Sequence, residues 1–137
     1  MIKCEVLLRD KKYHEEYAYT LEEFQKIEIP LINIKKSKKY YVNYVATFDI
    51  ETSKIEKSND EYEGFLYHWQ FCINGIVIFG RDWLQFAQLI YYLKDILELS
   101  NNKKLVVYVH NLSYEFHFLY NLFYISDVFC LDKRKVL

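Results

Sequence analysis

The sequence predicts an α/β fold, in which a mixed sheet has helices packed against it. Three strand-like segments come first in the central part of the chain, and a helical segment, a further strand and a second helical segment follow them. The chain has 137 residues and is 52% hydrophobic, so one domain can bury a sizeable core. We expect this domain to span residues 41–137, after an N-terminal extension of unclear role, residues 1–40.

The N-terminal extension contains a predicted strand and a predicted short helix. Residues 2–8 show a strand-like but imperfect alternation. Thr20 followed by Glu23 fits a capping box, which predicts a helix that continues to about Lys26. Pro30, the only proline, is expected to keep that helix from continuing.

The central segment predicts an antiparallel meander. We expect strands over about residues 42–51, 65–73 and 76–79. Asn74 and Gly75 separate the last two strands and are typical of a tight hairpin turn. The acidic and polar residues 53–63, between the first two strands, are predicted to form a loop.

A helix, a strand and a second helix complete the pattern. The first helix is indicated by apolar residues at helical spacing: Trp83, Phe86, Ala87, Ile90, Leu93 and Leu97. The polar residues 100–102 are expected to end it. Residues 105–109 are apolar or aromatic and rich in valine, which is typical of a strand covered on both faces. Beyond Asn111 the apolar residues recur every three or four positions, which predicts a helix whose first turn is capped by Asn111 or Ser113.

Two acids at the end of the first central strand are the strongest chemical signal. Asp49 and Glu51 are two residues apart, and side chains two apart on a strand share a face. The alternate residues are apolar or aromatic and are predicted to be buried: Tyr44, Ala46, Phe48 and Ile50. Both carboxylates would then point to one place, where a hard divalent cation binds readily. The alternative is an ordinary solvated strand end.

A third acid follows the second valine-rich strand. Glu115 lies four residues after Asn111, on the same side of the predicted helix start. A strand parallel to the first would bring this carboxylate beside Asp49. The alternative is a first-turn acid that the helix dipole favours.

Together these segments resemble the proofreading 3′ to 5′ exonuclease domain of family B DNA polymerases, most closely the protein-primed polymerases of phages. Residues 48–52 resemble the first exonuclease motif of that family, and residues 110–116 resemble the second. Residues 64–80 are similar to the hairpin that joins the two motifs in phage members, and residues 128–135 resemble the segment after the second motif. The resemblance covers about residues 42–137 and implies a ribonuclease H-like fold that is incomplete at its C-terminus.

The resemblance implies hydrolysis of single-stranded DNA 3′ ends with two Mg²⁺ or Mn²⁺ ions about 4 Å apart. It assigns Asp49 to bridge the ions, Glu51 to bind the first ion and orient the attacking water, and Glu115 to bind the second ion directly or through water. It assigns three polar residues to the DNA end: Thr52, Asn111 and Tyr114. Their alternative roles are a strand-end threonine, a capping asparagine and a core tyrosine.

Two features depart from the family pattern. Glu115 stands where the family usually has Asp, and the third motif, a Tyr with an Asp four residues later, has no counterpart before Leu137. We therefore expect a fragment of a phage or prophage polymerase, or a shortened homologue. Its open face would be covered by the remainder of the polymerase, by a homodimer mate or by another protein. The alternative function is an inactive homologue that acts as a protein- or nucleic-acid-binding module or as an inhibitor.

Composition narrows the class further. The net charge is −1, from 18 basic and 19 acidic residues, so any DNA would have to be held locally and not by a global basic field. Basic clusters lie at residues 35–39, 103–104 and 133–135, and such short runs are typically solvated turns. The three cysteines and four histidines show no zinc-ligand spacing. The sequence shows no targeting or membrane-spanning segment, so we expect a cytoplasmic protein, in the host cytosol if a phage encodes it.

Overall fold

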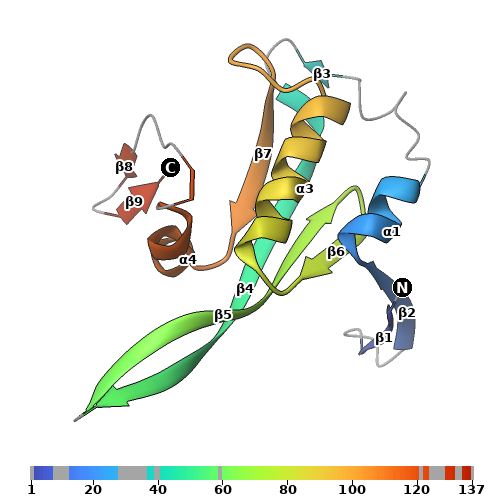
Figure 1. Cartoon of the computed structure of the whole chain (residues 1–137). Coiled ribbons are helices and arrows are strands. Elements are labelled where there is room, and N and C mark those ends of the chain that lie inside the picture. Colours follow the sequence, from blue (N-terminus) through green and yellow to red (C-terminus); the bar gives the residue numbers. More distant parts are fainter. Residues whose placement is uncertain are drawn as a thin grey trace.

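The computed structural model of the chain describes residues 2–7, 13–27, 37–38, 41–58, 60–120, 122–123, 129–131 and 134–136. Within these residues the protein is an α/β structure with a mixed, open sheet of seven strands (Figure 1). The strand order is β1-β2-β6-β5-β4-β3, and β7 also pairs with β4. The pairs β2/β6 and β4/β7 are parallel, whereas the other pairs are antiparallel.

The N-terminal extension contributes to this sheet. The predicted strand is confirmed as β1 (Ile2–Leu7), and it pairs with β2 (Tyr13–Tyr19), which the sequence did not predict. The predicted capping box is also confirmed, because Thr20 Oγ1 accepts from the Glu23 N–H at 3.3 Å and the Glu23 carboxylate accepts from the Thr20 N–H at 2.9 Å. The resulting helix is α1 (Leu21–Lys26), and Pro30 lies outside the described residues. The boundary at residue 40 between an extension and a main domain stays a prediction.

The strand that carries the two acids is longer than expected. It is β4 (Tyr41–Ser58), and its antiparallel neighbour is β5 (Glu61–Ile73). Ala46, Phe48 and Ile50 are buried while the residues between them are exposed, so the predicted alternation is confirmed. The predicted loop over residues 53–63 is wrong, because the two strands continue as a hairpin through most of it. Its side chains are exposed on both faces, so hydrophobic alternation could not reveal strands that backbone pairing holds together.

The predicted turn between the next two strands is confirmed. Asn74 and Gly75 have φ angles of 51° and 75°, as a two-residue type I′ hairpin requires. They connect β5 to β6 (Ile76–Gly80), and Ile73 pairs with Ile76 directly beside the turn. This tight turn sets the register that places Gln70 opposite Phe79 and Trp69 opposite Gly80.

The first predicted helix of the central domain is α3 (Trp83–Ile96), which lies across one face of the sheet (Figure 1). Asp82 is its N-cap and accepts from the Gln85 N–H at 2.7 Å. Phe86, Leu89 and Leu93 are buried, and Phe86 stacks on Phe48 with 4.6 Å between ring centroids. Leu89 was absent from the predicted apolar stripe although it is fully buried.

Helix α3 ends before the predicted residues 100–102 because the chain turns left-handed at Glu98, where φ is 55°. The Leu99 N–H then donates to the Lys94 carbonyl at 2.9 Å and the Glu98 N–H to the Asp95 carbonyl at 3.2 Å, which is a Schellman motif. A glutamate occupies the position at which glycine is favoured.

Replacing Glu98 by glycine is expected to raise the free energy of unfolding by about 0.5–1 kcal/mol, because glycine adopts a positive φ without strain. The ion pair with Lys103, at 3.9 Å, is mostly exposed on the glutamate side and contributes little. Urea denaturation measures the change. Glu98→Ala is the matched control, since it removes the carboxylate but keeps Cβ. A glycine variant no more stable than the alanine variant would contradict the prediction.

The strand and the helix predicted for the second half of the pattern are confirmed, but the predicted coverage of this strand on both faces is wrong, because Val107 is 39% exposed and Tyr108 is 62% exposed. β7 (Lys104–Val109) runs parallel to β4, and α4 (Leu112–Leu119) begins almost directly after it. The remaining described strands are β3 (Ser37–Lys38), which pairs with β4, and a separate small hairpin of β8 (Phe129–Leu131) and β9 (Arg134–Val136). The face of β4 and β7 away from α3 is exposed. On this face Val45 of β4 is 53% exposed and Tyr108 of β7 is 62% exposed. Among the described helices, none has the length and apolar character needed to cross a membrane.

Candidate functional site

The candidate site lies where two neighbouring parallel strands deliver polar residues to one place. Phe48 of β4 pairs with Val109 of β7, and the next residues along are Asp49 and His110. The carboxyl ends of parallel strands meet at the same edge of a sheet, and α4 begins at this edge. The parallel pairing of β4 with β7 therefore brings the two sequence motifs together.

Glu115, in the first turn of α4, is the central group of the site. Its side chain is only 2% exposed, and it is the one buried charged residue in the described part of the chain. Its Oε2 atom has no hydrogen-bond partner among those residues. Burial raises the pKa of the Glu115 carboxyl, and the charge and hydrogen bonding of Asp49 raise it further, against the opposing effects of its own backbone N–H and of His110. Asp49 and Glu115 are therefore electrostatic neighbours, as the sequence predicted.

Glu51 lies two residues further along β4, on the same exposed face as Asp49. It pairs with His68 of β5, and the His68 ring contacts the Gln70 carboxamide at 3.1 Å. No set of three or more His, Cys, Asp or Glu side chains within the described ranges is grouped closely enough to hold a metal ion. The coordination of an ion by Asp49, Glu51 and Glu115 together stays a prediction.

The donor chemistry of the closer pair fits a hard cation. Asp49 and Glu115 offer carboxylate oxygens, the ligands that Mg²⁺ and Mn²⁺ prefer. The Oε2 atom of Glu115 is buried and without a partner, which leaves an acceptor unsatisfied in the absence of a ligand. A buried carboxyl with a raised pKa also ionises more readily when a cation binds beside it.

Thr52 and Tyr114, two of the residues assigned to DNA, contact each other. The Thr52 and Tyr114 hydroxyl groups are hydrogen-bonded, which ties β4 to α4. The pairing of β4 with β5 shifts between Glu51 and Thr52, so an irregularity of the β-bulge type lies directly at this contact. Tyr114 remains 41% exposed, and its ring packs edge-on against Phe118.

Asn111, the third residue assigned to DNA, occupies the N-cap position of α4, as predicted. Its side chain makes no capping hydrogen bond; instead Asn111 Oδ1 accepts from the Ser113 hydroxyl at 3.2 Å. Its backbone carbonyl accepts from the N–H groups of Tyr114 and Glu115 at 2.9 and 3.2 Å. Asn111 is exposed, directly before the helix turn that carries Glu115.

A shallow groove of about 370 Å³ runs beside Asp49 on the exposed face of the sheet. Its polar lining includes Thr47, Gln70, Tyr108 and His110. Gln70 and Tyr108 were not singled out from the sequence. Their place follows from strand register, since Gln70 pairs with Asp49 and Tyr108 with Thr47.

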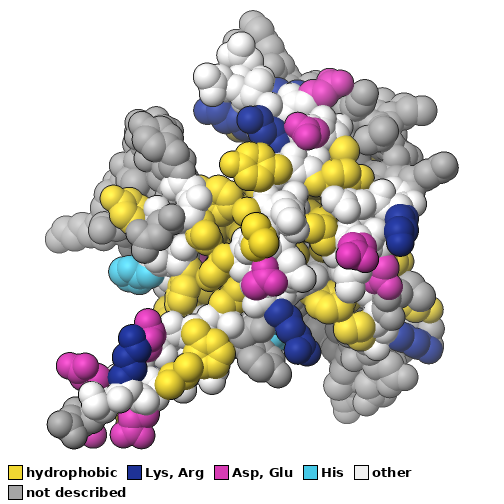
Figure 2. Space-filling view, in the orientation of Figure 1, with side chains coloured by type: hydrophobic (Ala, Val, Ile, Leu, Met, Phe, Trp, Pro, Cys, Tyr) yellow, Lys and Arg dark blue, Asp and Glu magenta, His cyan; other side chains and the backbone are white. Residues whose placement is uncertain are grey.

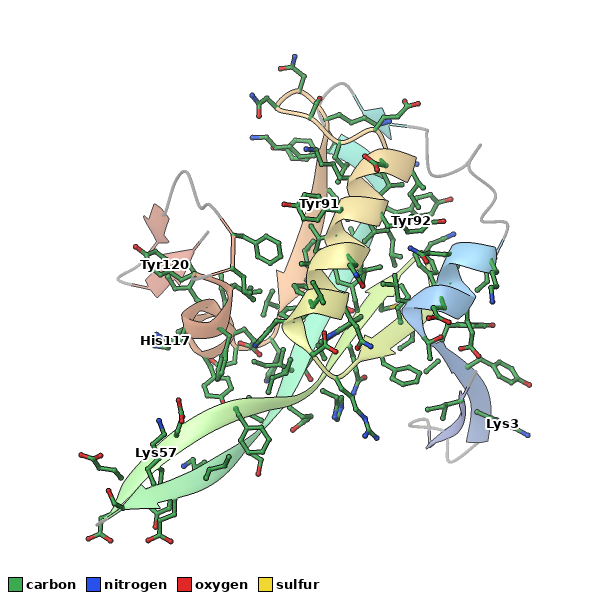
Figure 3. All side chains as sticks on the ribbon, in the orientation of Figure 1. Lys3, Lys57, Tyr91, Tyr92, His117 and Tyr120 are labelled. Carbon is green, nitrogen blue, oxygen red and sulfur yellow. The ribbon has the colours of Figure 1, made fainter. Side chains whose placement is uncertain are left out.

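His117 and Tyr120 do not belong to this site. Figure 3 shows both on the side of α4 that is turned away from α3, and both are exposed. No protein-family model, curated protein or solved structure matches the chain.

Proposed function

We propose that the protein is a metal-dependent 3′ to 5′ exonuclease domain that acts on single-stranded DNA, similar to the proofreading domains of phage-type family B DNA polymerases. The observation that carries the proposal is the buried Glu115 carboxyl beside Asp49, whose Oε2 atom has no hydrogen-bond partner among the described residues. Such a group is unfavourable for stability, and perturbed carboxyl groups of this kind are concentrated at functional sites.

The order of elements supports a ribonuclease H-like fold. The antiparallel strands β4, β5 and β6 are followed by α3, by the parallel strand β7 beside β4, and by α4. This is the order that the resemblance implies for the first part of such a domain. In this arrangement the first motif lies on β4, and the second motif begins directly after the adjacent strand β7 and continues into α4. This proximity is the condition for a shared site.

The carboxylates would act by holding divalent cations at the scissile phosphate. Asp49 and Glu115, which interact electrostatically, would provide two of the oxygen donors, and Glu51 would extend the donor set along the exposed face of β4. Bound cations supply positive charge to the phosphate and make an attacking water more acidic. Glu51, which is exposed, would accept a hydrogen bond from that water.

The DNA end would be held by polar groups around the carboxylates. The hydroxyl groups of Thr52 and Tyr114 can bond sugar and phosphate oxygens without reading sequence. The exposed ring of Tyr114 can stack on an unpaired base, and the Asn111 carboxamide offers a further donor. Because the net charge is only −1, these local contacts and the cations have to provide the affinity.

The test is digestion of a single-stranded oligonucleotide labelled at its 5′ end, with Mg²⁺ or Mn²⁺. We expect shortening from the 3′ end, and we expect Asp49→Ala to lower the rate by at least about 100-fold, because it removes charge from the reacting centre. Asp95→Ala, an exposed acid on α3, is the matched control and should keep the activity.

Absence of digestion, together with no Mg²⁺ or Mn²⁺ binding by calorimetry, would overturn the proposal. The inactive binding module or inhibitor would then be the better description. Digestion that Asp49→Ala does not reduce would point to a contaminating nuclease and would also count against the proposal.

A further inference from the structure

The hairpin formed by the distal parts of β4 and β5, residues 52–66, projects away from the sheet, and we call it the arm (Figure 1). β7 pairs with β4 only as far as Phe48, and β6 pairs with β5 only from Trp69. Both outer edges of the arm are therefore unpaired within the described residues. Isolated two-stranded hairpins are marginally stable, and unpaired strand edges are templates for pairing with another chain.

The arm also exposes apolar side chains. Ile55 is 53% exposed, Tyr62 is 62% exposed and Phe65 is 39% exposed. Figure 2 shows that the arm otherwise presents mostly charged and polar side chains, with Asp and Glu at its end. The arm contains four acidic and two basic residues, so a nucleic-acid backbone is a poor partner for it.

Lys54 and Glu56 of β4 have no charged residue directly opposite them on β5. Lys54 pairs with Gly64, and Glu56 pairs with Tyr62. The neighbouring Lys57, labelled in Figure 3, does form an ion pair with Glu63 of β5. The sequence Lys54-Ile55-Glu56 therefore presents an opposite pair of charges, symmetric about an exposed isoleucine, on an unpaired edge.

We propose that two copies of this chain associate through the β4 edges of their arms, antiparallel and centred on Ile55. In this register Ile55 lies opposite Ile55 of the second copy. Lys54 of each copy lies opposite Glu56 of the other, so the two-fold arrangement contains two ion pairs on one face and an apolar contact on the other face. The contact is isologous, as closed dimers require.

Other registers and the other edge are less favourable. An antiparallel pair centred on Lys54 places Lys54 of one copy opposite Lys54 of the other. A pair centred on Glu56 places Glu56 opposite Glu56. On the β5 edge, pairing centred on Tyr62 places Glu61 opposite Glu63. Like charges directly opposite each other destabilise a sheet, so the charges favour the β4 register centred on Ile55, with its two pairs of opposite charges, over these three alternatives.

The experiment is sedimentation equilibrium of the full chain at low salt, from about 10 µM to about 1 mM, the range that a small interface requires. The wild-type chain should dimerise with rising concentration. Lys54→Glu and Glu56→Lys, each alone, should weaken the dimer by at least about tenfold, because each places two pairs of like charges in contact. Lys94→Glu, an exposed charge reversal on α3, is the matched control and should leave association unchanged.

The decisive measurement is whether dimerisation is restored when the two charge reversals are combined. The double variant Lys54→Glu/Glu56→Lys should dimerise like the wild type. A mixture of the two single variants should form a heterodimer that is tighter than the homodimer of either single variant. Circular dichroism confirms that each variant is folded. A wild-type chain that stays monomeric, a dimer that Lys54→Glu does not weaken, or a mixture that does not associate would each overturn the proposal.

Discussion

Replacing Gly80 by alanine is expected to destabilise the protein by about 2–4 kcal/mol, because the new methyl group would overlap a buried ring. A Cβ atom at Gly80 would lie 2.6 Å from Trp69 Cε2, closer still to Trp69 Cζ2, and 2.8 Å from Gln85 Oε1. Trp69 is fully buried, and its indole N–H donates to the Asp82 carbonyl at 2.8 Å. The ring cannot move without breaking this bond and disturbing its packing against Phe86.

Gly64→Ala is the matched control for this prediction. A Cβ atom at Gly64 meets only Phe118 Cζ, at the ordinary contact distance of 3.9 Å, and Gly64 has no positive φ. We expect its stability to stay within about 1 kcal/mol of the wild type, since alanine is tolerated in a strand. Urea denaturation of both variants measures the difference. Equal stabilities would show that the packing around Trp69 is looser than described.

The elements that could be predicted from the sequence are those that a short stretch of chain determines by itself. The capping box of Thr20 and Glu23 and the turn at Asn74-Gly75 each depend on residues within a few positions. The buried alternation of β4 likewise depends on one strand lying against one core. Each of these predictions is confirmed.

The elements that were missed depend on pairing between distant segments. β2 joins the sheet through β1 and through two parallel pairs with β6, Ala18 with Val77 and Tyr19 with Ile78, and no local periodicity indicates such contacts. Residues 53–63, which form most of the arm, were predicted to be a loop because they are mostly acidic and polar and show no hydrophobic alternation. The early end of α3 depends on a left-handed glutamate, which sequence propensity disfavours.

Only the part of the candidate site that depends on a short stretch of chain could be predicted from the sequence with the same certainty. Asp49 and Glu51 share a face because of strand geometry alone, which the sequence shows directly. The approach of Glu115 to Asp49 requires β7 to lie beside β4, which the order of elements favours but does not determine. Gln70 and Tyr108 enter the site only through register, so no motif could identify them.

Glu115→Gln is expected to stabilise the protein at neutral pH without metal, by about 1–3 kcal/mol, because it removes the charge of a buried carboxylate whose Oε2 atom has no hydrogen-bond partner among the described residues. The folded-state pKa of Glu115 is raised, so the folded protein holds this proton more tightly than the unfolded chain does. The contribution of Glu115 to the free energy of unfolding is therefore largest below about pH 4, where a free glutamate is protonated. It decreases as the pH rises through the folded-state pKa. Glutamine does not ionise, so the stability of the variant does not decrease with pH in this way.

The measurement is thermal unfolding of both proteins in EDTA across a pH series. The two melting temperatures should be similar at acidic pH and should separate as pH rises, with the variant higher. Glu61→Gln, an exposed acid at the end of the arm, is the matched control and should follow the wild type at every pH. A difference that is constant with pH would show that Glu115 does not change its protonation in this range.

Divalent cations should reverse the order of stability. An ion that binds the folded protein stabilises it by mass action, and ligation at Glu115 requires the carboxylate form, so Mg²⁺ or Mn²⁺ should raise the melting temperature of the wild type more at higher pH. The glutamine variant should respond weakly, because its amide is a poorer ligand, and it should lose at least about 100-fold in nuclease rate. A variant that is more stable without metal and inactive with it would identify Glu115 as a residue retained for ion binding at the expense of stability. If the cations raise the melting temperatures of the two proteins equally, Glu115 does not bind the cation. The burial of its carboxylate would then need a structural explanation.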